Sequence, residues 1–455
     1  MIERMNTIHE AARDLPIAAE VDLCVVGGSC TGVFAAVAAA RLGLSVCVVE
    51  QLNQFGGTAT ASQICVWHAL WDTTGQRQIS AGLTAEVIGR LQARGAVLEN
   101  ERSNPNWQYC FQPAELAIEF DAQVLEHRIR PFLHARLAAV ARDGDRITAV
   151  IIEDKDGRRA IRTRSVIDAS GDADVLRRAG LTVRRPQNLQ PPTTAALLSG
   201  LDVLRREVPG FSLGQVLFDK TNPKALASGF VWSAPQPGMP GLDLVFGTRV
   251  IGADLLQADQ LTRAEMEGRA QVRRMVDLLR EAHPQHPVSL AALPARIGIR
   301  ETCHAECLHT LTVDEVLEGT PCADAIANGS YRVDIHPQGG GIVFRYLDGR
   351  EHRQDEQQRW HEGRWRAARA TDPTFYQIPY RCLVPRGLDN VLVAGRCLDA
   401  DHGAYGAVRV MMVCNQLGEA AGTAAAMAVR TGTTMTAVDP QILRKTLAEH
   451  GAVVI

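Results

Sequence analysis

Residues 21–50 read VDLCVVGGSCTGVFAAVAAARLGLSVCVVE, and this stretch decides the fold. The apolar run at 23–26 predicts a buried strand that stops at a turn of small residues, GGSCTG at 27–32. The alanine-rich segment that follows predicts a helix, and a second apolar run ends in the acid Glu50. Strand, turn, helix, strand and acid in this order place a helix N-terminus against a pyrophosphate and a carboxylate against a ribose. The stretch therefore predicts an α/β unit that binds a dinucleotide.

The turn departs at one position from the usual G-x-G-x-x-G pattern, because Ser29 stands where the second glycine is expected. Gly27 and Gly32 keep the glycines that serve the tight turn and the packing of helix on strand. Serine adds a β-carbon where phosphate comes close, but its hydroxyl can donate to a phosphate oxygen, and Gly28 leaves the neighbouring backbone free. Glu50 lies 18 positions past Gly32, near the ~20 expected for a ribose-binding acid. An ordinary crossover without a ligand is the alternative, since the motif is short and imperfect.

The composition is that of a globular protein. The chain has 455 residues, of which 46% are hydrophobic and 22% charged, and this length suits roughly two to three domains. The formal net charge of −3 gives no electrostatic reason to expect nucleic acid or an anionic membrane surface as a partner.

The cysteines and the N-terminal segment favour a cytoplasmic protein without a metal site. The 11 cysteines are odd in number and scattered through apolar runs, which is typical of reduced, buried thiols. Cys303, His304 and Cys307 stand close together in ETCHAEC, but a structural zinc site needs a second ligand pair, so we expect no metal. Residues 1–20 lack the apolar core of a signal peptide, and the longest apolar stretches carry polar residues, so we expect no membrane association.

Periodicity and turn residues place further elements along the chain. Helical spacing predicts helices at 81–96, 113–130, 262–282 and 409–430. Two β-like runs on either side of Asp156 and Gly157 predict a β-hairpin at 146–162, and apolar runs predict strands at 165–168 and 390–395. Between about 185 and 290 prolines become frequent and short β-like runs dominate, which predicts a second domain inserted into the first.

Four glycine-containing turns follow predicted apolar strands. They lie at Gly27, at Gly56 and Gly57, at Gly171 and at Gly395. A nicotinamide dehydrogenase needs one early nucleotide turn, whereas several dispersed turns suit a longer ligand that crosses several strand ends. FAD is such a ligand, because its adenosine, pyrophosphate, ribityl chain and isoalloxazine ring each need a niche.

Taken together, these segments resemble the FAD-dependent oxidoreductases of the glutathione-reductase-like fold. The similarity runs through the first turn and Glu50, the GGTAT loop at 56–60 and the VIDASGDAD stretch at 166–174. It continues through 297–302, 331–336 and 378–385 and is most specific at 390–426. It covers most of the chain except roughly 185–290.

The resemblance implies an α/β fold with a Rossmann-like FAD-binding domain, built from a parallel sheet with helices and a β-hairpin layer. A smaller, β-rich α+β substrate domain is inserted into it. We expect an N-terminal tail at 1–20, a discontinuous FAD-binding domain at 21–184 and 294–455, and the inserted substrate domain at 185–293.

The resemblance also implies which residues contact FAD, with the pyrophosphate at the first turn, the adenosine ribose at Glu50, and the N-terminus of the helix at 409–430 aimed at the flavin ring. The full set is Gly27, Gly28, Ser29, Cys30, Thr31, Gly32, Glu50, Gln51, Gly56, Gly57, Thr58, Ala59, Thr60, Ala169, Ser170, Gly171, Gly395, Arg396, Gly406, Val408 and Arg409. A helix N-terminus disfavours cations, so an arginine at position 409 favours a role toward the flavin or an anionic substrate.

Catalytic groups follow less directly, because the flavin carries the hydride chemistry and the protein orients and tunes it. His402 is the first choice as a base from its place before the helix at 409–430, and Tyr405 shares its loop. Arg300 and His336 complete the predicted set. A lone histidine more often forms a structural hydrogen bond than acts as a base. Trp67, His68 and Trp71 either line the isoalloxazine ring or belong to the core.

We therefore expect a cytoplasmic FAD-dependent oxidoreductase that transfers a hydride between a small organic substrate and the flavin, as an oxidase or a dehydrogenase. Its partners are that substrate and an electron acceptor, oxygen or another; a homo-oligomer remains open. One alternative is an FAD-dependent monooxygenase that uses NAD(P)H and oxygen. Another is a non-catalytic or electron-relay flavoprotein subunit.

Overall fold

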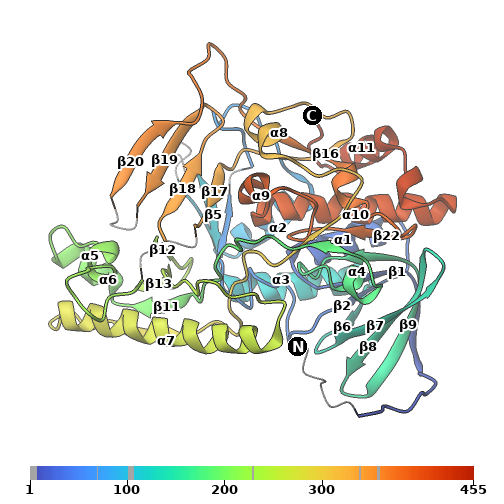
Figure 1. The fold of residues 1–455 in the computed structure, drawn as a ribbon, viewed down its shortest axis with the longest axis horizontal. Helices are drawn as coiled ribbons and strands as arrows, with labels where there is room; N and C mark the ends of the chain where they lie inside the picture. The colour runs from blue at the N-terminus through green and yellow to red at the C-terminus, as the bar shows by residue number, and fades with distance from the viewer. Residues whose placement is uncertain (1–7, 69, 101–106, 228–229, 338–339, 356–358) are drawn as a thin grey trace, which may run out of the picture.

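The structure is a computed structural model that describes residues 8–68, 70–100, 107–227, 230–337, 340–355 and 359–455 (Figure 1). Residues 1–7 of the predicted tail lie outside this part. A seven-stranded sheet carries the predicted nucleotide turn, with the order β6-β2-β1-β9-β8-β7 and with β22 also paired to β9. Its strands are β1 (Ile17–Val26), β2 (Val46–Val49), β6 (Arg130–Phe132), β7 (Arg136–Asp143), β8 (Arg146–Asp154), β9 (Gly157–Asp168) and β22 (Val391–Val393).

The strand register explains why distant glycine turns meet. Strands β6, β2, β1, β9 and β22 run parallel, and Val26 pairs with both Val49 and Asp168. Asp168 in turn pairs with Val393. Four strands therefore end at the same level, and the residues that follow them lie along one edge of the sheet, where doubly wound folds bind ligands.

The predicted hairpin is confirmed as the antiparallel pair β8–β9, which β7 extends into a β-layer at the sheet edge. Strand β1 begins at Ile17, inside the predicted tail, because residues 17–21 pair with residues 160–163 of β9. The predicted strands at 165–168 and 390–395 are confirmed within β9 and as β22.

Helices cover the parallel strands, and Figure 1 shows α10 lying across α1 and the sheet. The helices that contact the strands of this sheet are α1 (Cys30–Arg41), α4 (Asp174–Arg178) and α10 (Met411–Thr431). Three others, α2 (Gly82–Ala93), α3 (Pro113–Glu126) and α11 (Pro440–Glu449), pack on α1 or α10. The predicted helices at 81–96 and 113–130 are confirmed as α2 and α3, and Pro113 occupies the first turn of α3 as expected.

Helices α1 and α10 touch backbone to backbone. A β-carbon on Gly418 would lie 2.1 Å from the carbonyl oxygen of Thr31, and one on Gly422 would lie 2.0 Å from that of Ala35. No side chain fits at either position without moving one helix. The contact matters for function because α1 and α10 both reach the ligand edge of the sheet with their N-termini.

Replacing Gly422 by alanine is expected to lower the free energy of unfolding by about 2 kcal/mol or more, because overpacking against backbone forces the two helices apart. Gly89 in α2 is the matched control, since it is an exposed helical glycine with open space around its β-carbon position. Gly89→Ala should leave stability unchanged or raise it by about 0.5 kcal/mol. Thermal unfolding of both variants checks this, and equal midpoints would contradict the close packing of α1 on α10.

The predicted starting residue of the helix at 409–430 is wrong. The chain forms a short helix α9 (His402–Val408), then an extended residue, Val410, and only then α10. Asp401 fixes the start of α9 by accepting a hydrogen bond of 2.7 Å from the amide of Ala404. Arg409 is thus the C-terminal cap of α9, where a cation is favoured. The expectation that Arg409 begins the long helix in a disfavoured place is therefore wrong.

A second region lies away from the parallel sheet, on the left of Figure 1. One four-stranded sheet has the order β12-β13-β11-β14, and the other has the order β17-β18-β19-β20. Their strands are β11 (Ala196–Ser199), β12 (Trp232–Pro235), β13 (Leu242–Phe246), β14 (Ser289–Ala292), β17 (Val333–Ile335), β18 (Ile342–Arg345), β19 (Arg350–Gln354) and β20 (Trp360–Arg364). Phe230 contacts Phe344 and Trp360 edge-on, which joins the region 185–293 to strands that come later in the chain.

Helix α7 (Ala258–Ala282) runs beneath the first of these sheets and confirms the predicted helix at 262–282 (Figure 1). Shorter elements complete the described chain: β3 (Val66–His68), β4 (Val97–Glu99), β5 (Gln108–Phe111), β10 (Val183–Arg184), β15 (His304–Ala305), β16 (Ala325–Gly329), β21 (Tyr376–Pro379), α5 (Leu201–Glu207), α6 (Leu213–Leu217), α8 (Val313–Glu318), η1 (Tyr380–Leu383) and η2 (Met435–Ala437).

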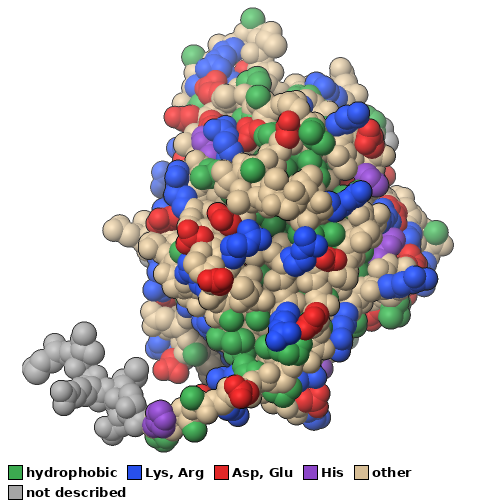
Figure 2. All heavy atoms as spheres, turned by 90° about the vertical axis from the view of Figure 1, so that its right-hand side faces the viewer, with side chains coloured by type: hydrophobic (Ala, Val, Ile, Leu, Met, Phe, Trp, Pro, Cys, Tyr) green, Lys and Arg blue, Asp and Glu red, His purple; other side chains and the backbone are tan. Residues whose placement is uncertain are grey.

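Among the described residues, no helix has both the length and the apolar character that crossing a membrane requires. On the face drawn in Figure 2, basic and acidic side chains are interspersed, in keeping with the small net charge.

Candidate active site

A cavity of about 480 Å³ lies along the ligand edge of the parallel sheet and extends toward the second region. Its lining brings together residues from all four glycine turns, as the sequence predicted. The lining includes Gly27, Ser29, Cys30, Thr31, Glu50, Gln51, Gly56, Gly57, Thr58, Ala169, Ser170, Gly171, Gly395, Arg396 and Arg409 among the predicted cofactor residues, and Arg300 and His336 among the predicted catalytic ones. Within the described chain, Gly28, Gly32, Ala59, Thr60, Gly406 and Val408 do not line it.

The glycines of the first turn are required by the protein's own packing. Gly27 has a φ of +99°, and a β-carbon there would lie 2.4 Å from the carbonyl oxygen of Ala169. A β-carbon on Gly32 would lie 1.8 Å from the carbonyl oxygen of Gly27. These two glycines let α1 close directly onto the end of β1, which sets the amides of the first helical turn at the cavity wall.

Ser29 fits its position because its backbone is extended, with a φ of −64°. Its hydroxyl accepts a hydrogen bond of 3.4 Å from the amide of Gly32 and so caps α1. Gly57, in the loop after β2, leaves room for the Ser29 side chain because it has no side chain of its own. A β-carbon on Gly57 would lie 2.9 Å from the β-carbon of Ser29. The departure from the usual motif is therefore matched by Gly57.

Glu50 is held at the end of β2 by two backbone amides. Its carboxylate accepts hydrogen bonds from Gly28 at 2.7 Å and from Leu52 at 2.8 Å. Burial raises the pKa of Glu50 above its ordinary value, while the amides of Leu52 and Gly28 act in the opposite direction. The side chain thus offers a fixed acceptor at the cavity wall, as a ribose hydroxyl requires.

The middle of the cavity favours negative charge. The first turns of α1 and α10 both line it, through Cys30 and through Met411 and Cys414, and helix N-termini attract anions. Arg396 is half-buried and donates to Asp172 at 3.1 Å, but its buried Nη1 has no hydrogen-bond partner among the described residues. A buried guanidinium nitrogen without a partner at the cavity wall fits the phosphates of a dinucleotide.

The inner end of the cavity carries a cluster of polar side chains. Asp334 accepts hydrogen bonds from Tyr331 at 2.9 Å and from Arg409 at 3.2 Å, and its Oδ1 lies 3.2 Å from His336 Nε2. His336 is 6% exposed, and its Nδ1 has no hydrogen-bond partner in the described chain. Burial, and then repulsion by Arg300, holds the pKa of His336 well below its ordinary value. The imidazole is therefore neutral near pH 7, and its Nδ1 is a hydrogen-bond acceptor without a partner in the described chain.

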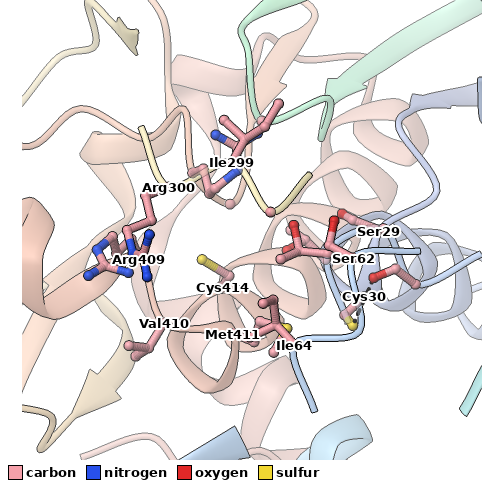
Figure 3. Close-up of a pocket in the computed structure, with 18 of the residues that line it drawn as sticks. Ser29, Cys30, Ser62, Ile64, Ile299, Arg300, Arg409, Val410, Met411 and Cys414 are labelled. Atoms are coloured by element: carbon pink, nitrogen blue, oxygen red, sulfur yellow. Dashed lines mark hydrogen bonds between the residues drawn. The ribbon is translucent and has the colours of Figure 1, made fainter. Parts of the chain in front are cut away.

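Figure 3 shows how Arg300 and Arg409 lie relative to the nucleotide turn. Arg300 and Arg409 come from different segments and lie beside each other on one side. Ser29, Cys30 and Ser62 lie on the other side, and the first turn of α10 lies between the two groups. The cavity therefore runs from the nucleotide turn, past the N-terminus of α10, to the arginines.

His402 and Tyr405 are not among the described residues that line the cavity, although their sequence position made them candidates. Tyr405 is fully buried and donates a hydrogen bond of 2.7 Å to the carbonyl oxygen of Arg300. His402 Nδ1 lies 3.9 Å from Glu301, and this carboxylate raises the pKa of His402. Both side chains lie on α9, which leads away from the cavity before the chain returns at Arg409, so they support the segment of Arg300 and Glu301.

Glu301 organises this supporting segment. It accepts from the amide of Gln190 at 2.9 Å and lies 3.0 Å from His304 Nε2. Burial opposes its ionisation, yet hydrogen bonds from His304 and His402 hold its pKa at about 2. Glu301 is thus an anchored carboxylate behind the cavity wall, next in sequence to Arg300.

Of the three aromatic candidates after the GGTAT loop, only His68 lines the cavity within the described chain. Trp67 is fully buried against Phe111, with ring centroids 5.0 Å apart, and Trp71 stacks on Trp107. Burial lowers the pKa of His68 to about 3, so its ring is neutral.

Sequence reasoning missed Arg249, which is 5% exposed and lines the inner end of the cavity. It follows β13 in the region without a recognised motif, so nothing in the sequence distinguished it from a surface arginine. Asp334 and Tyr331 belonged to the segment 331–336 of the family resemblance, but no role was assigned to them.

Comparison with known proteins gives one family. The model of a family described as FAD dependent oxidoreductase matches residues 22–447. No curated protein matches the chain.

Several solved structures match the chain at low identity. A geranylgeranyl bacteriochlorophyll reductase-like protein from Thermoplasma acidophilum is 12% identical over 95% of this chain and 83% of its own, with a TM-score of 0.46. The flavin-dependent brominase Bmp2 is 12% identical over 94% and 83%, with a TM-score of 0.47. The p-nitrophenol 4-monooxygenase PnpA from Pseudomonas putida DLL-E4 is 12% identical over 95% and 84%, with a TM-score of 0.46.

Proposed function

The chain belongs to the FAD-dependent oxidoreductase family and is an FAD-using enzyme, and from this premise we propose that it transfers a hydride between a small organic substrate and FAD. In this proposal it works as an oxidase or a dehydrogenase without a nicotinamide partner. One observation carries the proposal: the same cavity joins the four glycine turns to a buried cluster of polar side chains around His336.

The residues at the sheet edge fit FAD. The first turn and the N-terminus of α1 would hold the pyrophosphate, Glu50 the adenosine ribose, and Arg396 the phosphate side. The loop at Gly56 and Gly57 and the first turn of α10 would border the ring. FAD bound there supplies the hydride acceptor, and the N-terminus of α10 favours the negative charge that arises on reduction.

His336 is the residue best placed to take the substrate's proton. Asp334 lies beside Nε2 and favours the tautomer that keeps a proton there, so Nδ1 remains an unpartnered acceptor. As a hydroxyl or amine carbon loses its hydride, the proton on its oxygen or nitrogen would pass to Nδ1. Burial of this cluster excludes water from the transfer. Tyr331 and Arg409 hold Asp334 in place through their hydrogen bonds to its Oδ2.

The domain division belongs to the same proposal. The parallel sheet with its β7–β8–β9 layer supports a glutathione-reductase-like FAD domain formed by 21–184 and 294–455. The region 185–293 would be the inserted substrate domain. It contributes Trp232, Phe246 and Arg249 to the cavity, which supports a role in choosing the substrate.

Two other functions remain as outcomes of a test. A monooxygenase would use NAD(P)H and oxygen together, but the sequence offers no second G-x-G-x-x-G turn for a nicotinamide domain. An electron-relay subunit would present FAD at an exposed apolar patch, whereas here the candidate flavin niche opens into a buried polar cluster.

The test is a turnover assay of the purified flavoprotein with small alcohols, amines and acids, in air and with an artificial acceptor dye. We expect product to form without added NAD(P)H. Product that forms only when NAD(P)H and oxygen are both present would replace the proposal with the monooxygenase. Failure of every substrate, with dye reduced only by a partner protein, would replace it with the relay subunit.

A further inference from the structure

Three arginines from separate segments converge at the inner end of the cavity. Arg249 follows β13, Arg300 precedes Glu301, and Arg409 links α9 to α10. Arg249 and Arg300 each donate a hydrogen bond of 2.8 Å to the same hydroxyl oxygen, that of Thr193. Arg300 and Arg409 lie beside each other in Figure 3. The three guanidinium groups therefore surround one small volume.

Protein anions balance only part of this charge. Among the described residues, Asp334 is the one carboxylate that lines this end, since Glu50 and Asp174 belong to the nucleotide end. The side-chain hydrogen bonds of Arg249 and Arg300 go to neutral oxygens. Their acceptors are Thr193 Oγ1 and the carbonyl oxygens of Thr248, Phe230 and Pro191.

Keeping these cations buried is costly for the protein alone. Burial, and then repulsion by Arg249, holds the pKa of Arg300 well below its ordinary value, and burial lowers the pKa of Arg249 to about 10. A buried charge without an ionic partner destabilises the protein. An arrangement that keeps two such charges side by side, hydrogen-bonded to neutral groups, is suited to an anion that arrives from solution.

We propose that the inner end of the cavity is a carboxylate-binding subsite formed by Arg249, Arg300 and Arg409, so that the substrate is a small organic acid. This rests on the proposed function, because it names the substrate class for the same site. Guanidinium groups bind carboxylates through paired, planar hydrogen bonds. The subsite would hold the acid group and turn the carbon to be oxidised toward His336 and the flavin niche.

The side chains that line the cavity beside the arginines indicate the shape and polarity of the rest of the substrate. Trp232 and Phe246 stack with ring centroids 4.0 Å apart, and both line the cavity. Phe230 and Phe344 add a second pair of rings to the lining, with centroids 6.1 Å apart. Flat apolar surfaces next to a cationic subsite suit an acid with a flat apolar body.

The charges at this end of the cavity are unevenly balanced. Arg332 also lines it, with its guanidinium carbon 4.0 Å from the centre of the Phe344 ring. Asp334 accepts its hydrogen bond from Arg409. Arg249 and Arg300, whose side-chain acceptors are neutral, therefore remain to bind a substrate carboxylate.

The test is equilibrium binding of benzoate to the FAD-loaded protein, followed by the change in the visible flavin spectrum. Benzamide serves as the neutral probe of the same shape, and phenyl phosphate as the other anion. We expect benzoate to bind saturably and at least about 10-fold more tightly than benzamide, since hydrogen bonds between charged groups are stronger than hydrogen bonds to a neutral amide.

Two substitutions test whether the subsite arginines cause the difference between benzoate and benzamide binding. Arg300→Met should weaken benzoate binding about 10-fold or more and leave benzamide binding unchanged, with FAD content as the check that the protein is intact. Arg249→Met should act in the same direction. Arg162→Met is the matched control, because Arg162 is exposed on β9 and pairs with Glu20; it should change nothing.

Equal binding of benzoate and benzamide, or tighter binding of phenyl phosphate, would overturn the carboxylate subsite. So would an Arg300→Met protein that holds FAD and binds benzoate like the parent. These are binding measurements, so they separate the two proposals. Benzoate that binds as expected without any turnover would count against the proposed reaction alone, and turnover of uncharged substrates by a protein that ignores benzoate would count against the subsite alone.

Discussion

Replacing Ser29 by leucine is expected to give a folded protein that has lost its FAD. Ser29 lines the cavity at the first turn, lies in close contact with Gly57, and caps α1. A leucine side chain has no room against Gly57 and would extend into the cavity at the first turn, where the pyrophosphate is proposed to lie. Crowding of this kind costs ~1–3 kcal/mol or more, so we expect FAD to bind about 100-fold more weakly. The ratio of flavin to protein absorbance after purification and FAD titration measures this.

Ser29→Gly is the matched control, because glycine restores the usual motif and is tolerated as a helix N-cap. It should retain FAD. Thermal unfolding of the FAD-free proteins separates a local from a global defect, and we expect similar midpoints for both variants. A leucine variant that purifies with a full complement of FAD would show that the pyrophosphate lies elsewhere.

Replacing His336 by glutamine is expected to lower kcat/KM by a factor of about 10² to 10⁴, the range that a general base contributes. The glutamine amide can keep a contact with Asp334, so the cluster should stay in place while the proton acceptor is lost. The FAD spectrum should not change. His361→Gln is the control, since His361 is 56% exposed on β20 and pairs with Asp355, and it should retain full activity.

The pH dependence gives a second check on His336. The base must be neutral, and burial with repulsion by Arg300 places its pKa well below the ordinary value of a histidine. On lowering the pH through 6.5, kcat/KM should therefore stay level rather than fall. An acid limb centred near 6.5 in the parent enzyme and absent from His336→Gln would contradict the lowered pKa.

The sequence was sufficient for the nucleotide-binding half of the fold. The run from Val21 to Glu50 predicts β1, α1 and β2 because apolar runs, small turn residues and a terminal acid are local signals. The late strand at 390–395 was likewise visible as an apolar run before a glycine. The parallel register then brings the turns after these strands to one edge, as the pattern implied.

The break between α9 and α10 could not be predicted from the sequence. Residues 402–431 contain no proline, and Val410 is extended while its neighbours are helical, so no local signal marks the break. Near this break, α9 packs closely against a strand that comes earlier in the chain: a β-carbon on Gly406 would lie 2.9 Å from the carbonyl oxygen of Asp334 in β17. That contact is tertiary, so it is visible only in the folded chain.

The inner cluster was only partly predictable for the same reason. Arg300 and His336 emerged as candidates from chemistry-bearing residue types in segments of the family resemblance. Their partners Arg249 and Thr193 come from the proline-rich region, and they meet Arg300 only when the chain is folded. Buried arginines and surface arginines look alike in a sequence, and only the folded chain separates them.

The most direct test of the account is the anaerobic spectrum of the FAD-loaded protein on addition of small organic acids that carry an oxidisable hydroxyl or amine, with NAD(P)H absent. The account predicts that one class of these acids bleaches the visible flavin band fully, and that Arg300→Met slows the bleaching. A flavin that stays oxidised with every acid and bleaches promptly with NADH alone would contradict it.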